Sequence, residues 1–505
     1  MVIPDDAQLG EFRDTYAGMA GMLLERPDEG PHNTPGFGGS TLINGSERFF
    51  ERLEASPCDR IDAPAFLKAR LMDMVVGDKD RHLGQWRWAS FPRGACRSWR
   101  PIPEDRDQAF INFDGFTMWV LRRMRPIQIG FGERYPSIVG LTFNGWEVDR
   151  ELLAELNRRT WDSVAAVIQR ELTDEVIEAA VRRFPPHAYR TTGERITRSL
   201  KARRDKLPEA ADAYYRLIAK QVDIYATDVD ELAEIEHRPN GDVEVTIAEW
   251  DGQAPRAAVT PYYRRTFHPD ETREIRLYLR GGSDRAVVRG QRARITVYVI
   301  GGGGSDQLIN ASRVRAGRTR LYDARGDNVF DRGVGARVDR RRFQRPPSKT
   351  DIHRYGLDWG HGRITLPTGS YSTDLGAVLG GFMTLERYGF RKVPYAQRHT
   401  LRAGFATGAT EFLFSYRGRF RRIGRSLDAT VHLKYSGLDI TRFHGFGNET
   451  AITSPSSFFK VERQEFVVDP MLVLAPSSTF EIGVGPVLKV ADTDLEDNAN
   501  RVIGS

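Results

Sequence analysis

The spacing of apolar residues changes twice along the chain, which divides it into three parts. Before about residue 235, apolar positions recur at the spacing of helices. One such run spans residues 66–75 and stops at Gly77, which predicts a helix that ends at this glycine. Asp149 precedes one further run and Thr173 or Asp174 precedes another, and these residues stand where helix N-caps are expected. The first part is therefore predicted to be rich in helices, with short strands among them.

A strand period replaces the helical period from Val243 onward, and a short motif repeats within it. Each copy is a strand, then a glycine-rich corner, then an aspartate. The copies lie ~20 residues apart, which predicts a solenoid-like domain of stacked β-rungs. The corner aspartates either cap tight glycine turns, which we favour, or bind calcium. They are Asp284, Asp306 and Asp327.

Strict alternation of apolar and polar residues follows after about residue 355. In residues 411–420 the aromatic side chains fall on one face of a strand, and residues 427–435 and a segment from Phe480 repeat the pattern. The alternating segments are ~10 residues long and carry aromatics near their ends, as transmembrane β-strands do. A soluble β-sandwich would also alternate, so the period alone leaves both structures open.

The three parts predict a multidomain protein. We expect an α+β module at residues 1–235, an all-β rung domain at 236–350, and part of an antiparallel transmembrane β-barrel at 351–505. About six barrel strands are expected, whereas a closed single-chain barrel requires at least ~8. The chain is therefore expected to be a fragment that continues past its C-terminus. Its N-terminus resembles no signal peptide, so an export signal is expected further upstream.

Composition and charge exclude some classes of function. The chain has 505 residues, of which 74 are basic and 68 acidic, with a net charge of +6. Because the two signs are interspersed, we expect a mixed solvated surface and no nucleic-acid partner. Cys58 and Cys96 fit either one bridge formed in an oxidising compartment or two separate buried thiols, and we favour the thiols.

The polar residues with the clearest chemistry follow the helix that ends at Gly77. Phosphoryl transfer requires a carboxylate that orients the attacking hydroxyl and further ligands that hold magnesium. Residues 78–86 and 104–108 offer such groups on either side of a predicted strand pair. The alternative is a buried Asp–Arg–His network that merely holds the turn, and both interpretations remain open.

The phrase Gly-Asp-Lys-Asp-Arg-His at residues 77–82 resembles a motif of atypical kinases, namely the secretory-pathway casein kinases, the CotH kinases and the HipA type. The resemblance implies a module similar to a kinase C-lobe that uses magnesium. No upstream strand carries the lysine that holds the nucleotide phosphates in kinases, so this chain alone is expected to be inactive. By the resemblance, the catalytic residues are Asp80, Arg81 and His82, and the magnesium ligands are Gln85, Asp105 and Asp107.

Three phrases stand out among the barrel-like strands. They are Tyr-Gly-Phe-Arg at 388–391, Pro394-Tyr395, and Arg-Phe-His-Gly-Phe-Gly-Asn-Glu-Thr at 442–450. They resemble the barrels of the BamA/TamA superfamily, also called bacterial surface antigens, over about residues 355–505. The resemblance implies a Gram-negative outer-membrane protein whose partners are outer-membrane lipid and the barrel assembly machinery. The soluble part would then lie in the periplasm or on the cell surface.

These resemblances together imply a barrel that anchors a kinase-like module, with phosphotransfer on an envelope substrate. Glu25-Arg26-Pro27 also resembles a phrase of large bacterial envelope proteins that combine the two parts. A first alternative is a protein assembly or translocation factor. It predicts tandem domains before the barrel, and the front half of the sequence shows no such repeat. A second alternative is a non-catalytic adhesin or scaffold that binds through the rungs.

Overall fold

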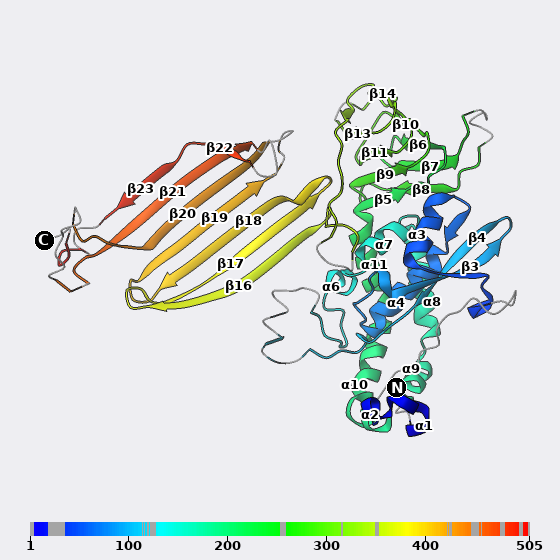
Figure 1. Ribbon diagram of the computed structural model, residues 1–505, viewed down its shortest axis with the longest axis horizontal. Helices are drawn as coiled ribbons and strands as arrows, with labels where there is room; N and C mark the ends of the chain where they lie inside the picture. The colour runs from blue at the N-terminus through cyan, green and yellow to red at the C-terminus, as the bar shows by residue number, and fades with distance from the viewer. Residues whose placement is uncertain are drawn as a thin grey trace. The chain divides into compact units, whose positions relative to one another are not determined.

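The structure, a computed structural model, divides into two compact units (Figure 1). It describes residues 5–18, 36–113, 115, 117–118, 121, 128–252, 259–314, 317–348, 353–421, 423, 427–445, 454–455, 457–474, 480–493 and 498–502. Glu25-Arg26-Pro27 and residues 446–450, which carry parts of the family resemblances, lie outside the described residues. The N-terminal unit comprises Met1–Met118, Pro126–Gln344 and Thr350–His353, and the C-terminal unit comprises Trp119–Arg125, Arg345–Lys349 and Arg354–Ser505.

The first sheet of the N-terminal unit has, in spatial order, β1 (Leu42–Gly45), β3 (Trp86–Arg93), β4 (Cys96–Pro103) and β2 (Asp59–Ile61). β3 and β4 form an antiparallel hairpin. β2 runs parallel to β4, which places Cys58 beside Cys96, and the two form a disulfide. The expectation of two separate thiols was therefore wrong.

Two helices pack against this sheet, α3 (Ser46–Ala55) and α4 (Ala63–Val76). Asp62 caps α4 by accepting a hydrogen bond from the Ala65 N–H at 3.1 Å. Gly77 ends the helix with φ of 76°, a left-handed conformation that glycine adopts without a steric penalty. The predicted end of this helix is confirmed.

Thr173 caps its helix as predicted, because its side chain accepts a hydrogen bond from the Val176 N–H at 3.3 Å. Asp149 does not cap one; it lies inside a helix and pairs with Arg70, so that prediction was wrong. The short elements of the described part are α1 (Asp6–Leu9), η1 (Gly10–Phe12), α2 (Arg13–Tyr16), η2 (Phe37–Gly39) and η3 (Leu83–Gln85). The later helices are α6 (Ile138–Thr142), α7 (Trp146–Leu152), α8 (Arg158–Glu171), α9 (Asp174–Arg182), α10 (Pro186–Asp205) and α11 (Leu207–Ala219).

One hydrophobic core joins the sheet to these helices. Phe49 of α3 stacks on Trp88 of β3 with ring centroids 3.9 Å apart, and Phe66 of α4 packs on Trp86 at 5.1 Å. Each buried aromatic removes about 150–250 Å² from water, so these contacts are strongly favourable. They hold α4 and β3 together and thereby fix both ends of the loop that joins the two elements.

Two stacked sheets of mostly parallel strands complete the unit. One sheet has, in spatial order, β15 (Arg337–Asp339), β13 (Thr319–Tyr322), β11 (Thr296–Gly302), β9 (Glu274–Arg280) and β5 (Gln221–Tyr225). The other has β14 (Val329–Asp331), β12 (Gln307–Asn310), β10 (Arg285–Gly290), β6 (Glu231–His237), β7 (Val243–Glu249) and β8 (Tyr263–Phe267), of which β7 and β8 are antiparallel.

The parallel strands stack as rungs, and equivalent residues of neighbouring rungs are 22 positions apart in the repeated part. Tyr298 stacks on Tyr322 of the next rung with centroids 5.9 Å apart. Apolar side chains such as Leu277 and Val299 fill the space between the two sheets and are fully buried. The first rung begins at Gln221, so the boundary expected at 236 falls inside the rungs.

The C-terminal unit is one antiparallel sheet of long strands (Figure 1). At one edge of the sheet, two short strands, β22 and β23, both pair with β21. Within the described residues the sheet is open, with β16 at the other edge. Its strands are β16 (His361–Ser372), β17 (Gly376–Gly389), β18 (Lys392–Ala406), β19 (Glu411–Phe420), β20 (Leu427–Arg442), β21 (Lys460–Leu474), β22 (Ile482–Val484) and β23 (Leu488–Asp492).

The strand register separates an apolar face from a polar face of this sheet. Phe414 pairs with Tyr435, which pairs with Phe466, and these paired residues share one face. On the other face, Ser415 pairs with Lys434. The alternation predicted for residues 411–420 and 427–435 is confirmed. Within the described ranges, none of the helices combines the length and apolar character that a membrane crossing requires.

Candidate functional site

The loop after α4 carries the residues with predicted chemistry, and a buried arginine fixes its shape. Arg81 is fully buried and forms ion pairs with Asp73 at 3.2 Å and with Asp78 at 2.6 Å. It also donates hydrogen bonds to three backbone carbonyls, those of Gln85, Glu104 and Asp105. Arg81 therefore ties the loop to the end of β4. These contacts engage its guanidinium and burial shields it from solvent, whereas the predicted catalytic role of Arg81 stays a prediction.

A second buried arginine extends this network to α7. Arg70 pairs with both oxygens of Asp149 at 2.7 and 2.9 Å and with Asp73 at 3.0 Å, and Tyr214 donates a hydrogen bond to Asp149. Burial raises the pKa of Asp149, while Arg70 opposes the rise. We refer to Arg70, Asp73, Asp78, Arg81 and Asp149 as the buried charge network. Local spacing could not predict it, because its members come from three separate segments.

Asp80 remains available for chemistry. Its carboxylate accepts one hydrogen bond, from the Asn144 amide at 2.7 Å, and the side chain is only half-buried. Asn144 lies just before α7 and was not among the predicted site residues, since no sequence pattern connects it to Asp80. The amide orients the carboxylate without neutralising it, so Asp80 can accept a proton or a hydrogen bond from a bound hydroxyl.

The other predicted site residues have contacts or exposure of their own. His82 caps η3 by accepting a hydrogen bond from the Gly84 N–H at 3.1 Å, and its second ring nitrogen lies 3.5 Å from the Gln85 amide nitrogen. Asp105 and Asp107 are exposed on the turn after β4. The described residues include no group of three or more His, Cys, Asp or Glu side chains placed to hold a metal ion. The magnesium ligands implied by the kinase resemblance, Gln85, Asp105 and Asp107, stay a prediction.

His353 is an unexpected neighbour of this loop. Its ring lies 5.5 Å from the ring of Trp146 and 6.2 Å from that of Phe143. Neither of its nitrogens has a hydrogen-bond partner among the described residues. Burial, and after it the nearby His82, lower the pKa of His353 to about 4. The ring is therefore neutral at pH 7, and nothing in the local sequence marks it as part of this site.

The corner aspartates of the rungs occupy a buried ladder. Asp284 accepts a hydrogen bond from the Glu231 N–H, Asp306 accepts one from the Asp284 N–H, and both distances are 2.9 Å. Asn328, not Asp327, takes the next position by accepting from the Asp306 N–H at 2.7 Å. Asp327 is exposed, so its placement with the other two corner residues was wrong. The ladder caps backbone N–H groups of neighbouring rungs, whereas the favoured expectation was that each aspartate caps its own glycine turn.

Burial of the ladder carboxyls favours their neutral form. Burial, and then the neighbouring Asp306 and Glu231, raise the pKa of Asp284 to about 9. Burial and a hydrogen bond with Asp323 raise the pKa of Asp306 to about 7. A protonated carboxyl can donate a hydrogen bond to its neighbour, so the pair Asp306–Asp323 can share one proton.

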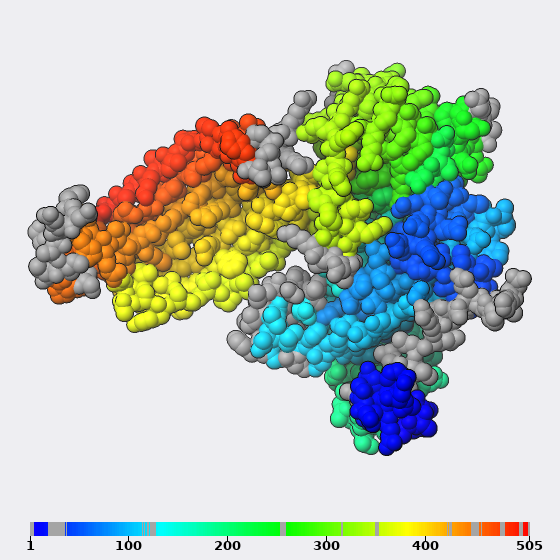
Figure 2. Space-filling model, in the orientation of Figure 1, coloured from blue at the N-terminus to red at the C-terminus, as the bar shows by residue number. Residues whose placement is uncertain are grey.

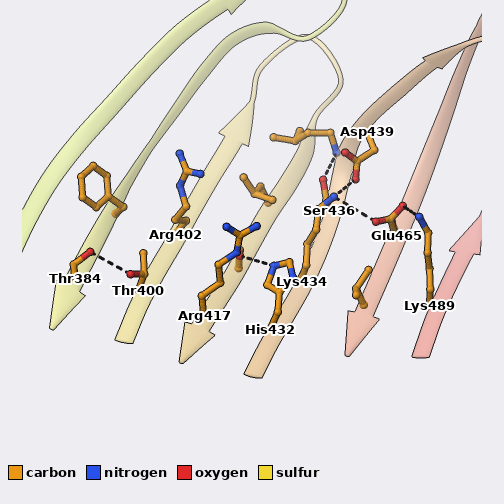
Figure 3. Close-up of a pocket in the computed structure, with 15 residues that line it drawn as sticks. Thr384, Thr400, Arg402, Arg417, His432, Lys434, Ser436, Asp439, Glu465 and Lys489 are labelled. Atoms are coloured by element: carbon orange, nitrogen blue, oxygen red, sulfur yellow. Dashed lines mark hydrogen bonds and ion pairs between the residues drawn. The ribbon is translucent and has the colours of Figure 1, made fainter. Parts of the chain in front are cut away.

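A hollow of about 790 Å³ lies on the polar face of the C-terminal sheet (Figure 3). Lys434 forms ion pairs there with Asp439 at 2.6 Å and with Glu465 at 3.4 Å, and Lys489 pairs with Glu465 at 2.8 Å. Hydroxyl groups interact across the strands as well, because the Thr384 and Thr400 side chains are 3.3 Å apart. Arg402, Arg417 and His432 also line the hollow.

The sequence and structure of the chain were also compared with known proteins. No protein-family model, curated protein or solved structure matches this chain.

Proposed function

We propose that the C-terminal unit is part of the wall of an outer-membrane barrel and anchors the N-terminal unit in the cell envelope. The observation that carries the proposal is the placement of large apolar side chains on the open face of the sheet. Phe412 is 59% exposed, Phe414 49% and Leu472 52%. Soluble monomers rarely expose contiguous apolar patches beyond a few hundred Å². Lipid is the solvent that would cover such a face favourably.

The distribution of charge supports the same proposal. The outward positions of β19 (412, 414, 416, 418 and 420) carry no charged residue, and neither do those of β20 between Leu427 and Tyr435. The charged residues of these stretches alternate onto the opposite face, around the hollow. A barrel wall requires this arrangement, with lipid outside and a wet lumen inside.

The disulfide between Cys58 and Cys96 fits an envelope location. Disulfides persist in oxidising compartments such as the periplasm and are rare in the cytosol. The bond joins β4 to the segment before β2 in the N-terminal unit, so that unit would lie on an oxidising side of the membrane.

A matched pair of substitutions in β19 tests the membrane proposal. Phe414→Arg places a charge on the apolar face, whereas Leu413→Arg places the same charge on the neighbouring position that lines the hollow. A lipid-facing arginine costs about 2–4 kcal/mol near the bilayer midplane. With the full chain exported in a Gram-negative host, Phe414→Arg should deplete the protein from the outer-membrane fraction and Leu413→Arg should not. Equal membrane levels for both variants, or a wild-type chain in the soluble fraction, would overturn the proposal.

We propose, as a second function, phosphotransfer at Asp80, favoured by the carboxylate that Asn144 orients. Asp80 would accept the hydrogen bond of an attacking hydroxyl, and the buried charge network would only hold the loop. Any transfer of labelled phosphate from Mg-ATP should be lost in Asp80→Asn and kept in Asp270→Asn, which changes an exposed acid that is not among the predicted site residues. Equal transfer by both variants would exclude this role.

A further inference from the structure

The polar hollow of the C-terminal sheet contains two arginines that have no counterion within the described part of the chain. Lys434 and Lys489 are paired with Asp439 and Glu465, so the acids that line the hollow are already engaged. Arg402 and Arg417 form no ion pair or hydrogen bond with any described residue, and both side chains are exposed in the hollow.

The two arginines lie close together. Arg402 of β18 is opposite Ser415 of β19, and Arg417 is opposite Thr400, so the arginines occupy diagonal positions on one face. Diagonal neighbours of an antiparallel pair are about 7–8 Å apart, which long side chains can bridge. Figure 3 shows both guanidinium groups on neighbouring strands within the hollow.

Directional hydrogen-bonding groups surround the two cations. Thr400 lies two positions before Arg402 on the same face of β18. The Ser415 hydroxyl lies 3.4 Å from the His432 ring nitrogen. His432 is opposite Arg417 in the strand register. Two guanidinium forks together with hydroxyl and imidazole groups match the charge and the several oxygens of a phosphate group.

We propose that Arg402 and Arg417 form a binding site for a phosphate group on the polar face of the sheet. The shared chemistry is a phosphate dianion, supplied either free in solution or by a lipid phosphomonoester. The site rests on the proposed function in one respect, since the polar face must be a wet lumen. A bound anion would neutralise the positive charges of Arg402 and Arg417, which form no ion pair with any acid of the described residues.

The chain offers matched controls on the same strands. Arg398 of β18 and Arg419 of β19 share the polar face with Arg402 and Arg417, but each has an acidic partner, Glu386 at 2.5 Å and Glu481 at 3.1 Å. The double variant Arg402→Gln/Arg417→Gln therefore removes two unpaired charges. The double variant Arg398→Gln/Arg419→Gln removes two paired charges and changes the net charge equally.

The experiment measures binding by the full chain in a neutral detergent. In the first arm, inorganic phosphate is titrated by calorimetry in a buffer without phosphate or sulfate. In the second arm, phosphatidic acid in mixed micelles is compared with phosphatidylcholine. We expect Arg402→Gln/Arg417→Gln to weaken binding at least tenfold in one arm, and Arg398→Gln/Arg419→Gln to weaken it less than threefold.

The two arms identify the source of the phosphate group. Binding of inorganic phosphate indicates a free ligand, whereas binding restricted to phosphatidic acid indicates a lipid headgroup. Equal losses in the two double variants, or no binding in either arm, would overturn the site. Circular dichroism and membrane fractionation of the wild type report separately on the fold and on the barrel proposal, so either failure can be recognised.

Discussion

The two units differ in whether the apolar faces of their sheets are buried by protein. In β9 of the N-terminal unit, Ile275, Leu277 and Leu279 are fully buried between two stacked sheets. In β21 of the C-terminal unit, Phe466 is 44% and Leu472 52% exposed. Both hydrophobic core clusters of the described residues belong to the N-terminal unit.

The difference shows that an alternating strand pattern fixes which residues share a face but not what covers that face. A second sheet covers the apolar face of the rungs, and protein–protein packing supplies their stability. The C-terminal sheet has its apolar face open among the described residues. The same alternating pattern is therefore compatible with an apolar face covered by protein and with one covered by lipid, and substitutions can distinguish the two.

The largest effect is expected where the N-terminal unit buries charge. Arg81→Met would leave Asp78 buried without its ion-pair partner and would remove one of the three arginines that pair with Asp73, and removing one partner of a buried ion pair costs about 3–5 kcal/mol. Arg106→Ala is the control, because Arg106 also pairs with Asp73 but is 41% exposed, so we expect a loss below ~1 kcal/mol. Urea unfolding of the full chain, followed by tryptophan fluorescence, measures both. Similar losses would mean that the network is not buried as described.

A pair of leucine truncations sharpens the comparison directly. Leu277→Ala removes a fully buried side chain between the two rung sheets and should lower the free energy of unfolding by about 2–5 kcal/mol. Leu472→Ala removes a half-exposed side chain from the open face and should cost less than ~1 kcal/mol in neutral detergent. The urea midpoints of the two variants, each compared with that of the wild type, measure the two losses. A larger loss for Leu472→Ala would show that another protein surface, not lipid or detergent, covers that face.

The disulfide should contribute an intermediate amount, and only in the N-terminal unit. Cys58 and Cys96 are 38 positions apart, and removing a native disulfide of this kind costs about 2–4 kcal/mol. Cys58→Ser/Cys96→Ser should lower the urea midpoint of the tryptophan signal. A reducing agent should do the same to the wild type and nothing further to the variant. An unchanged midpoint of the wild type on reduction would contradict this assignment, because the chain has no cysteines besides these two.

Local sequence signals predicted local structure well. The end of α4 at Gly77 and the cap of α9 at Thr173 follow from residues adjacent to the features themselves. The alternation in β19 and β20 follows from the two-residue period of a strand. Each of these features depends on interactions within a few positions along the chain.

Features that depend on distant partners were missed or misplaced. Asp149 is spaced like a helix cap, but its partner Arg70 lies in another helix, and burial decides its role. Asn144 meets Asp80 only after the chain has folded. The ladder position falls on Asn328 rather than Asp327 because stacking of rungs, not the glycine corner, sets the register.

The smallest expected effect is a change in how stability depends on pH. The folded pKa of Asp306, about 7, lies above its usual value of 3.8, so the folded state binds a proton more tightly than the unfolded chain. Its stabilising contribution is fully present below about pH 4 and is lost as the pH rises through about 7. Asp284, with a folded pKa of about 9, continues the loss to higher pH. The wild type should therefore be more stable at pH 5 than at pH 8.

Asp306→Asn tests this origin, because the amide oxygen can still accept the hydrogen bond from the Asp284 N–H, as Asn328 does for Asp306 one rung further. The variant cannot ionise, so its urea midpoint should fall less between pH 5 and pH 8 than that of the wild type. Asp327→Asn changes an exposed aspartate of the same corner and should leave the pH profile unaltered. Parallel profiles for wild type and Asp306→Asn would place the pH dependence outside the ladder. A flattened profile would instead show that the rungs, unlike the open C-terminal sheet, are stabilised by protons held in their interior.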